Sequence, residues 1–151
     1  MDITIRNAVK QDIEDILRIQ KKAFAFQAKK YNDYEMPPMV ETYEDVLKDI
    51  ENQMVFVAVL DSKIVGSVRV IRNQDEAEIK RLAVDDDYHN NGIGHMLMDI
   101  AELQHRELKR LWLLTGSESY KSINMYKKLG YEIYKEADHK DYKLVYLQKF
   151  L

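Results

Sequence analysis

The sequence predicts a mixed α/β fold of the α+β kind, with a mostly antiparallel sheet flanked by helices. Three runs rich in apolar residues follow one another at 54–60, 63–71 and 76–84, which favours antiparallel hairpins. A helical pattern then separates the third run from an apolar strand at 111–115. Such a strand–helix–strand unit requires a parallel pair with a right-handed crossover. Two alternating runs, 131–137 and 141–150, end the sequence as strands.

The first third of the chain predicts one strand and two helices. Ile3–Val9 begins with the alternation of a strand, and apolar residues recur at helical spacing from Asp12 onward. Tyr31–Glu41 contains both prolines of the chain and is expected to be a loop. Thr42 begins a capping-box pattern with Asp in place of Glu, which predicts a second helix up to about Asn52. The expected order is therefore β-α-α-β-β-β-α-β-α-β-β.

Composition favours one domain, residues 1–151, with an ordinary hydrophobic core. Hydrophobic residues make up 46% of the 151 residues and charged residues 32%. The net charge of −3 gives no reason to expect a nucleic-acid partner. The sequence has no cysteine, which excludes disulfides, thiolate metal sites and a cysteine nucleophile. No apolar run has the length of a signal peptide or a membrane span, so we expect a cytoplasmic protein without membrane contact.

Residues 85–97, DDDYHNNGIGHML, hold the motif on which the functional interpretation depends. Gly92 and Gly94 follow a predicted strand and open a predicted helix. The first N–H groups of a helix have no internal partner, and the helix dipole is positive there. Glycines remove the Cβ atoms that would keep an anion away from these amides. The pattern predicts a phosphate-binding turn. The helix that follows is marked by Ile93, Met96, Leu97, Ile100, Leu103 and Leu108.

Other interpretations of the same stretch fit less well. A hairpin at Asn91-Gly92 needs a following strand, whereas the next residues have helical periodicity. His89, His95 and the three acids at 85–87 show no metal-ligand spacing, so we expect no metal site and interpret the acids as a solvated turn. A dinucleotide fingerprint would need a third glycine at Leu97, and the Gly-Lys-Ser/Thr of a P-loop does not occur.

Two motifs together resemble the GNAT (Gcn5-related N-acetyltransferase) superfamily. His89–Gly94 corresponds to its Gln/Arg-x-x-Gly-x-Gly/Ala turn, and Tyr126–Tyr131 to its helix end Tyr-x-x-x-Gly-Phe/Tyr. The resemblance extends over nearly the whole chain and implies a GNAT-type three-layer domain. Two positions depart from the pattern. His89 replaces the Gln or Arg, and Ser119 stands where the helix of the family often begins with Asn.

The resemblance implies an N-acetyltransferase that moves the acetyl group of acetyl-CoA to a primary amine by direct attack. Tyr126 matches the general acid of the family, and Glu78 matches the position of a carboxylate base in several relatives. A tyrosine that merely packs on a helix face, and a glutamate that merely faces solvent, are the structural alternatives. A non-catalytic acyl-CoA-binding sensor or regulatory module is the alternative function, and the intact Gly92 and Gly94 disfavour a domain without any ligand.

The resemblance also implies how the donor would be held. Backbone groups around Leu82–Val84 would pair with the pantetheine arm, and the amides of Asn90–His95 would hold the pyrophosphate. Protonation of His89 beside the pyrophosphate would strengthen this binding. The implied cofactor-binding residues are Leu82, Ala83, Val84, His89, Asn90, Asn91, Gly92, Ile93, Gly94, His95, Ser119 and Ser122.

The amine acceptor is not identified by the sequence. We expect it to enter beside the loop at 31–44, whose acids and aromatic residues suit a cationic amine. The residues concerned are Tyr31, Tyr34, Tyr43, Asp33, Glu35, Glu41 and Glu44. The final alternating run, 141–150, is expected to lie at a sheet edge, where it could pair with a second copy in a homodimer.

Overall fold

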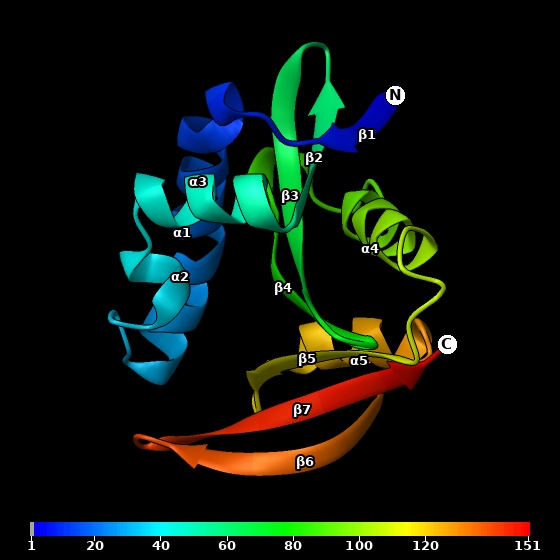
Figure 1. Cartoon of the computed structure of the whole chain (residues 1–151). Helices are drawn as coiled ribbons and strands as arrows, with labels where there is room; N and C mark the ends of the chain where they lie inside the picture. The colour runs from blue at the N-terminus through cyan, green and yellow to red at the C-terminus, as the bar shows by residue number, and fades with distance from the viewer. Residues whose placement is uncertain (1) are drawn as a thin grey trace.

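A seven-stranded mixed sheet organises the computed structural model, which describes residues 2–151 (Figure 1). The strand order is β1-β2-β3-β4-β5-β7-β6, and every neighbouring pair is antiparallel except β4–β5. The strands are β1 Ile3–Asn7, β2 Met54–Leu60, β3 Lys63–Asn73, β4 Glu76–Val84, β5 Arg110–Gly116, β6 Glu132–His139 and β7 Tyr142–Phe150. The helices are α1 Ile13–Tyr31, α2 Pro37–Val40, α3 Tyr43–Asn52, α4 Ile93–Leu103 and α5 Tyr120–Lys128, with single 3₁₀ turns at Lys10–Asp12 and Asp86–Tyr88.

Local sequence signals explain most of these boundaries. The Thr42 hydroxyl accepts a hydrogen bond from the Asp45 N–H at 3.3 Å, and the Asp45 carboxylate accepts one from the Thr42 N–H at 2.9 Å. This is the predicted capping box, and it begins α3. Gly130 has a φ of +99° just after α5, the left-handed conformation that commonly ends helices. The predicted fold class and order of the main elements are confirmed.

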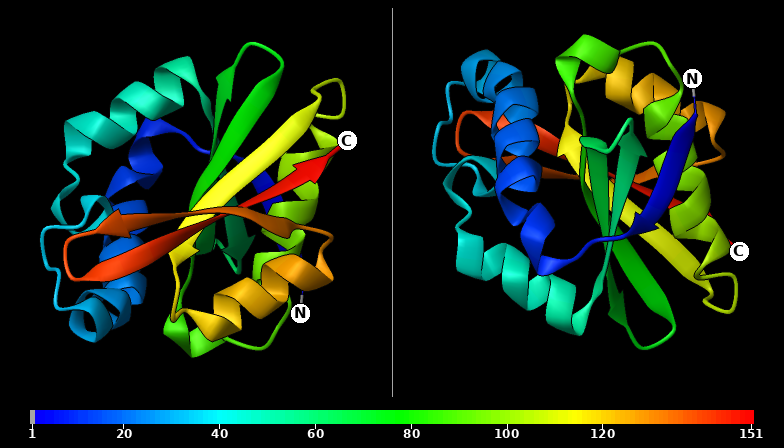
Figure 2. Two further views of the ribbon diagram at one scale, coloured as in Figure 1. Left: turned by 90° about the horizontal axis from the view of Figure 1, so that it is seen from below. Right: turned by 90° about the horizontal axis from the view of Figure 1, so that it is seen from above.

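Helices cover both faces of the sheet, and each face has its own core. On one face α1 and α3 pack against β2 and β3, with Ile13, Ile16 and Val46 fully buried. On the other face α4 packs its Leu97 and Met98 against the larger core. The view from above in Figure 2 shows α1 and α3 on one side of the sheet and α4 on the other. The spacing of apolar residues in each helix therefore matches the face it buries.

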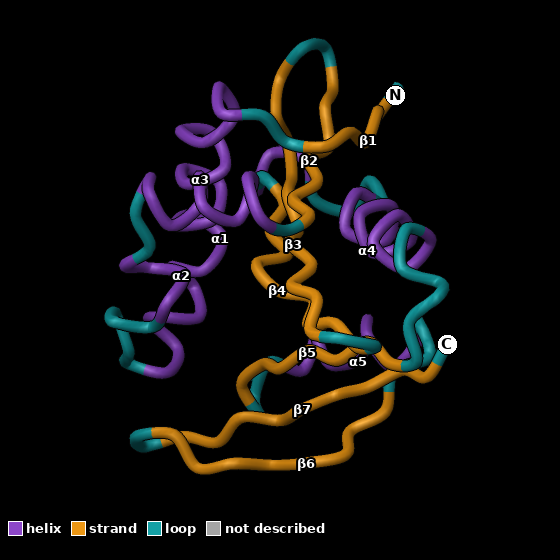
Figure 3. The backbone as a smooth tube through the Cα atoms, in the orientation of Figure 1, coloured by secondary structure: helices purple, strands orange, loops and turns teal. Residues whose placement is uncertain are grey.

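Three predictions about single elements were wrong. The loop at 31–41 contains the short helix α2, because its two prolines stand at the first helical positions, where no N–H is needed (Figure 3). The helix expected up to Leu108 ends at Leu103. Leu108 lies beyond it and is buried in the larger core, so its apolar character reflects packing rather than helical periodicity. Asp85 is buried, and only the two acids after it are exposed.

The final strand is also not an edge strand. β7 lies between β5 and β6, so both of its backbone edges are already paired. The strands at the two edges of the sheet are β1 and β6. Pairing with a second copy through β7, as expected from the sequence, is therefore ruled out. None of the helices within residues 2–151 is long and apolar enough to cross a membrane.

Candidate active site

A cleft opens where β4 and β5 separate. The two strands pair only from Glu76 opposite Arg110 to Glu78 opposite Trp112, and they make no further pairs within residues 2–151. A volume of about 1400 Å³ lies between them and extends to the beginnings of α4 and α5. Figure 1 shows β5, β7 and β6 crossing below the first four strands. The divergence leaves the edge of β4 from Ile79 to Val84 without a partner strand, so its backbone groups can bind a ligand.

A bulge in β4 changes which side chains of this strand line the cleft. Ser67 pairs with Ala83 while Arg69 pairs with Lys80, so Arg81 and Leu82 together stand opposite Val68. Arg81 has a φ of +60°, which marks the bulged position. The bulge reverses the alternation of side chains between the two sheet faces. Leu82, Ala83 and Val84 all line the cleft.

The glycine turn forms the second wall. Gly92 has a φ of +76°, which favours glycine, and it is the N-cap of α4. The first α-helical bond runs from the Met96 N–H to the Gly92 carbonyl, so the N–H groups just before Met96 are left without an intrahelical partner. A Cβ on Gly94 would meet Met125 at 3.8 Å and Val84 at 3.9 Å, which are ordinary contact distances, whereas a Cβ on Gly92 would have no atom within 4 Å. The turn has the geometry of an anion site.

Ten of the twelve predicted cofactor-binding residues line the cleft, and two do not. The Asn91 amide donates to the Tyr88 carbonyl at 3.1 Å. The buried Ser119 hydroxyl donates to Gln27 Oε1 at 2.8 Å and lies 2.7 Å from the Tyr31 hydroxyl, which ties the start of α5 to α1. The ten lining residues are Leu82, Ala83, Val84, His89, Asn90, Gly92, Ile93, Gly94, His95 and Ser122.

The two residues predicted to be catalytic face the same cleft from different elements. Tyr126 lies on α5, is half-buried, and packs edge-on against Tyr131 with ring centroids 6.2 Å apart. Burial raises the pKa of Tyr126 to about 12. Glu78 is half-buried at the last β4–β5 pair, where burial raises the pKa of its carboxyl although the charges of Lys80 and Arg81 oppose this. The cleft therefore holds a carboxylate whose basicity is increased and a phenol that keeps its proton at neutral pH.

The acids of the 31–44 loop do not line the cleft. The carboxylate of buried Asp33 accepts hydrogen bonds from Lys140 and from the Tyr142 hydroxyl, both at 2.7 Å. These bonds join the loop after α1 to the β6–β7 hairpin. From this region the cleft is lined instead by Tyr31, Met36, Pro37 and Pro38. The expectation that the loop offers acids to a cationic amine is therefore not supported.

Glu41 belongs to a buried ionic network that no motif predicted. The side chain of Arg69 is fully buried and donates to Glu41 at 3.0 Å and to Asp49 at 2.9 Å. Arg81 donates to Glu41 at 3.3 Å. Burial by itself raises the pKa of Glu41, but the hydrogen bonds and charge of Arg69, with the charge of Arg81, outweigh it and hold the pKa at about 2. The only sequence signal was an arginine inside an apolar strand.

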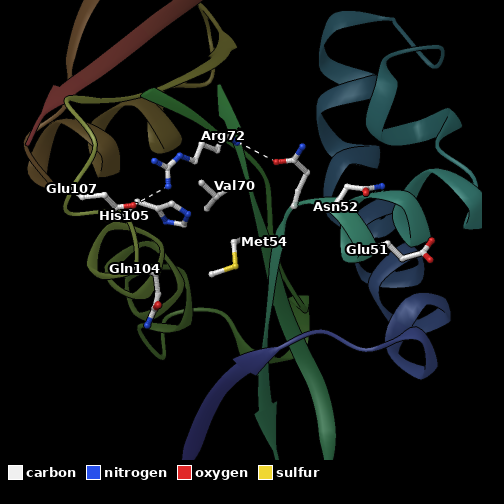
Figure 4. Close-up of a pocket in the computed structure, with 9 residues that line it drawn as sticks. Glu51, Asn52, Met54, Val70, Arg72, Gln104, His105 and Glu107 are labelled. Atoms are coloured by element: carbon white, nitrogen blue, oxygen red, sulfur yellow. Dashed lines mark hydrogen bonds and ion pairs between the residues drawn. The ribbon is translucent and has the colours of Figure 1, made fainter. Parts of the chain in front are cut away.

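A second and smaller pocket lies away from these residues. It has a volume of about 370 Å³ and lies beside the start of β2, which β1 does not reach, between the end of α3 and the turn after α4 (Figure 4). Arg72 and Glu107 pair across it at 3.0 Å, and both side chains are more than half exposed. His105 is buried there, with its Nδ1 atom 2.7 Å from the Ala101 carbonyl oxygen. None of the predicted site residues lines this pocket.

Comparison with known proteins agrees with the fold and the motifs. A model of the acetyltransferase (GNAT) family matches residues 13–131. An uncharacterized N-acetyltransferase of Methanocaldococcus jannaschii is 31% identical over 140 residues, which is 85% of this chain and 60% of that protein. The [ribosomal protein bS18]-alanine N-acetyltransferase of Escherichia coli is 37% identical over 59 residues, which is 38% of this chain and 40% of that protein. The chain therefore belongs to the GNAT acetyltransferase family.

Solved structures of low sequence identity share the fold. The PaiA N-acetyltransferase of Thermoplasma acidophilum, in complex with coenzyme A, has a TM-score of 0.85 at 19% identity and covers 100% of both chains. A ribosomal-protein-alanine N-acetyltransferase of Brucella melitensis has a TM-score of 0.78 at 21% identity, covering 98% of this chain and 99% of its own. The chain spans 60% and 40% of the length of the two curated relatives described above.

Proposed function

We propose that this protein transfers the acetyl group of acetyl-CoA to a primary amine. One observation supports the proposal most strongly. The cleft between β4 and β5 is lined by an unpaired strand edge, by the glycine-containing N-terminus of α4, and by the side chains of Glu78 and Tyr126. Family membership and the coenzyme A bound by the similar Thermoplasma protein support the choice of donor.

The donor would be held mainly by backbone groups. The free edge of β4 at Leu82–Val84 can pair with the amides of the pantetheine arm, and the N–H groups at the start of α4 can hold the pyrophosphate. Lys121 and Lys128 on α5 also line the cleft and add positive charge for the phosphates. Acetyl-CoA supplies an activated thioester.

The chain would supply three functions to the transfer. Glu78 accepts a proton from the ammonium of the acceptor, since only the free amine has a lone pair to attack the thioester carbonyl carbon. A backbone N–H on the β4 edge donates to the oxyanion that forms. The nitrogen then gives up its second proton to water, and as the C–S bond breaks Tyr126 donates a hydrogen bond to the leaving thiolate, which takes up a proton after release. Because the pKa of Tyr126, about 12, exceeds the ordinary thiol value of about 8.5, this bond stabilises the thiolate more than it protonates it.

Release of free CoA tests the proposal. The chain has no cysteine, so a thiol reagent detects only CoA released from the donor. Incubated with acetyl-CoA and a panel of amines, the wild type should release thiol only with a suitable amine. Tyr126→Phe should reduce this rate about tenfold or more, and Glu78→Gln about a hundredfold near neutral pH but much less at high pH, where the amine is already deprotonated.

Other outcomes would favour other assignments. If acetyl-CoA raises the melting temperature but no amine gives thiol release, a non-catalytic acyl-CoA sensor becomes the better proposal. Two departures from the family pattern favour this alternative. Ser119 joins α5 to α1 instead of lining the cleft, and His89 lies 3.3 Å from Asp86. A homodimer and a cytoplasmic location stay predictions.

A further inference from the structure

Two opposite charges stand unpaired on one face of β4. Ala77 and Ile79 point into the core beneath α4, so Glu78 and Lys80 project from the other face of the strand, on the side of α1. Within residues 2–151 neither side chain makes a hydrogen bond or an ion pair, with each other or with any other residue. Both line the cleft. They stand two residues apart on a strand, which places their Cα atoms roughly 7 Å from one another.

The neighbouring charges neutralise one another. Lys80 is the strand partner of Arg69, whose charge is met by Glu41 and Asp49. Arg81 pairs with Glu41 as well. Arg69, Arg81, Glu41 and Asp49 thus form a closed network, and on this strand Glu78 and Lys80 are left to bind a ligand.

Most of the remaining lining at this end of the cleft is apolar or aromatic, and the polar side chains there are Lys22 and Gln27 of α1, Arg81 of β4 and His139 of β6. Phe24 and Tyr31 of α1, Met36 beside α2, and Tyr142 and Leu144 of β7 line it. Asp33, the nearest acid of the loop, is buried and held by Lys140 and Tyr142. The surroundings suit an apolar group and offer no second carboxylate to a polycation.

Resting on the proposed function, we propose that the acceptor is a zwitterionic amine, an α-amino acid with an apolar or aromatic side chain. Its ammonium binds Glu78, the base that takes its proton, and its carboxylate binds Lys80. The side chain lies against the apolar wall of α1 and β7. Lys80 is thus a specificity-determining residue, and it separates free amino acids from amines without a carboxylate, including peptide N-termini and polyamines.

Matched amines test this assignment. Phenylalanine, phenylalaninamide and phenethylamine share the aromatic group and the amine, but only the first has a carboxylate. The amide also loses its ammonium proton more readily, so a preference for phenylalanine cannot arise from amine basicity. We expect kcat/KM for phenylalanine to exceed that for the amide at least about tenfold, and spermidine to be a poorer acceptor still.

Substitution of Lys80 provides the decisive comparison. Lys80→Gln should reduce the ratio of phenylalanine to phenylalaninamide to near one, with the KM for acetyl-CoA unchanged. Lys143→Gln removes the same charge from an exposed position of β7 that does not line the cleft, and it should leave the ratio as in the wild type. A ratio near one in the wild type, or an unchanged ratio in Lys80→Gln, would overturn the proposal.

Binding measured without turnover separates this proposal from the proposed function. Calorimetric titration of phenylalanine and phenylalaninamide into the protein saturated with CoA should show the same preference and the same loss in Lys80→Gln. Preferential binding without any acetyl transfer would keep the site and reject the transferase. Equal binding of both amines, or better transfer to the amide, would reject the site, and the latter result would point to a peptide N-terminus as acceptor.

Discussion

The two ends of the cleft are built in different ways. The end that we propose for the donor, called the donor end, is formed by backbone, with the free edge of β4 and the first amides of α4 within one segment, residues 82–95. The end that we propose for the acceptor, called the acceptor end, is formed by side chains from α1, α2 and the β6–β7 hairpin, joined by contacts such as Asp33 to Lys140, 107 residues apart. A backbone site tolerates changes of side chain, whereas a side-chain site changes with each substitution. With this assignment, the acceptor end can change by substitution while the donor end is kept.

The largest effect is expected from Glu41, which anchors the acceptor end. Glu41→Gln leaves the buried Arg69 without its strongest partner, and we expect the free energy of unfolding to fall by about 3 kcal/mol. Chemical denaturation measures this loss. Glu44→Gln, an exposed change on the first turn of α3, is the control and should stay within about 0.5 kcal/mol. Equal stability of the two variants would mean that the network does not hold this end.

The same carboxylate gives the acceptor end a pH dependence. The pKa of Glu41 is about 2 in the folded protein, below the ordinary value of 4.5, so folding favours the ionised form. This stabilisation is complete above pH 4.5 and is lost as the pH falls toward 2. At 1.36 kcal/mol for each pH unit, it amounts to about 3 kcal/mol. Glu41→Gln should lose less stability than the wild type between pH 4.5 and 2.

A substitution at Gly94 should affect the donor end alone. A valine side chain there would fill the space in front of the α4 amides, while a Cβ meets only ordinary contacts with Met125 and Val84. Gly94→Val should therefore fold, as its melting temperature would show, but bind acetyl-CoA at least about tenfold more weakly. The KM for the acceptor should hardly change. Unchanged affinity for acetyl-CoA in titration calorimetry would place the donor elsewhere.

Asp33→Asn should have the complementary effect at the acceptor end. The amide loses the charge that holds Lys140, so the hairpin wall that carries Tyr142 is held less firmly. We expect the acceptor KM to rise roughly threefold to tenfold and the acetyl-CoA KM to stay within about twofold. Asp141→Asn, at the exposed tip of the same hairpin, is the matched control. A rise in the acetyl-CoA KM instead would contradict the separation of the two ends.

The smallest effect is expected at His89. His89→Ala should weaken acetyl-CoA binding only roughly twofold to threefold, because the imidazole lies 3.3 Å from Asp86 and both side chains are about half exposed. Titration calorimetry measures this difference. An unchanged affinity in the variant would remove His89 from donor binding.

The same contrast explains what the sequence could predict. The glycine turn, the capping box of α3 and the alternating strands are local patterns, and the structure confirms them. The start of the cleft follows from the parallel β4–β5 unit, which was also predicted. The role of Ser119 was not predictable, because its partners Gln27 and Tyr31 lie some ninety residues earlier. Tyr31 also requires a glycine at 116, since a Cβ there would lie 2.2 Å from its ring.

The acceptor end was misjudged for the same reason. The acids at 31–44 suggested a cationic amine, but Asp33 and Glu41 are paired with cations that composition does not place beside them. The alternation in the last strand suggested a strand at the edge of the sheet. Instead β6 is the edge strand, and β7 lies between β5 and β6. Whether a charge is buried, and where a strand lies in a sheet, depend on contacts between distant segments. Local patterns in a single sequence do not reveal these contacts.

Transfer of a labelled acetyl group tests the central claim most directly. The protein would be incubated with acetyl-CoA carrying a ¹³C-labelled acetyl group and with the best amine of the panel, and the products would be identified by NMR. Because hydrolysis also releases thiol, the position of the label is the decisive observation. The account predicts that the label appears in an amide bond to the acceptor nitrogen. Label found only in acetyl-CoA or in free acetate would contradict it.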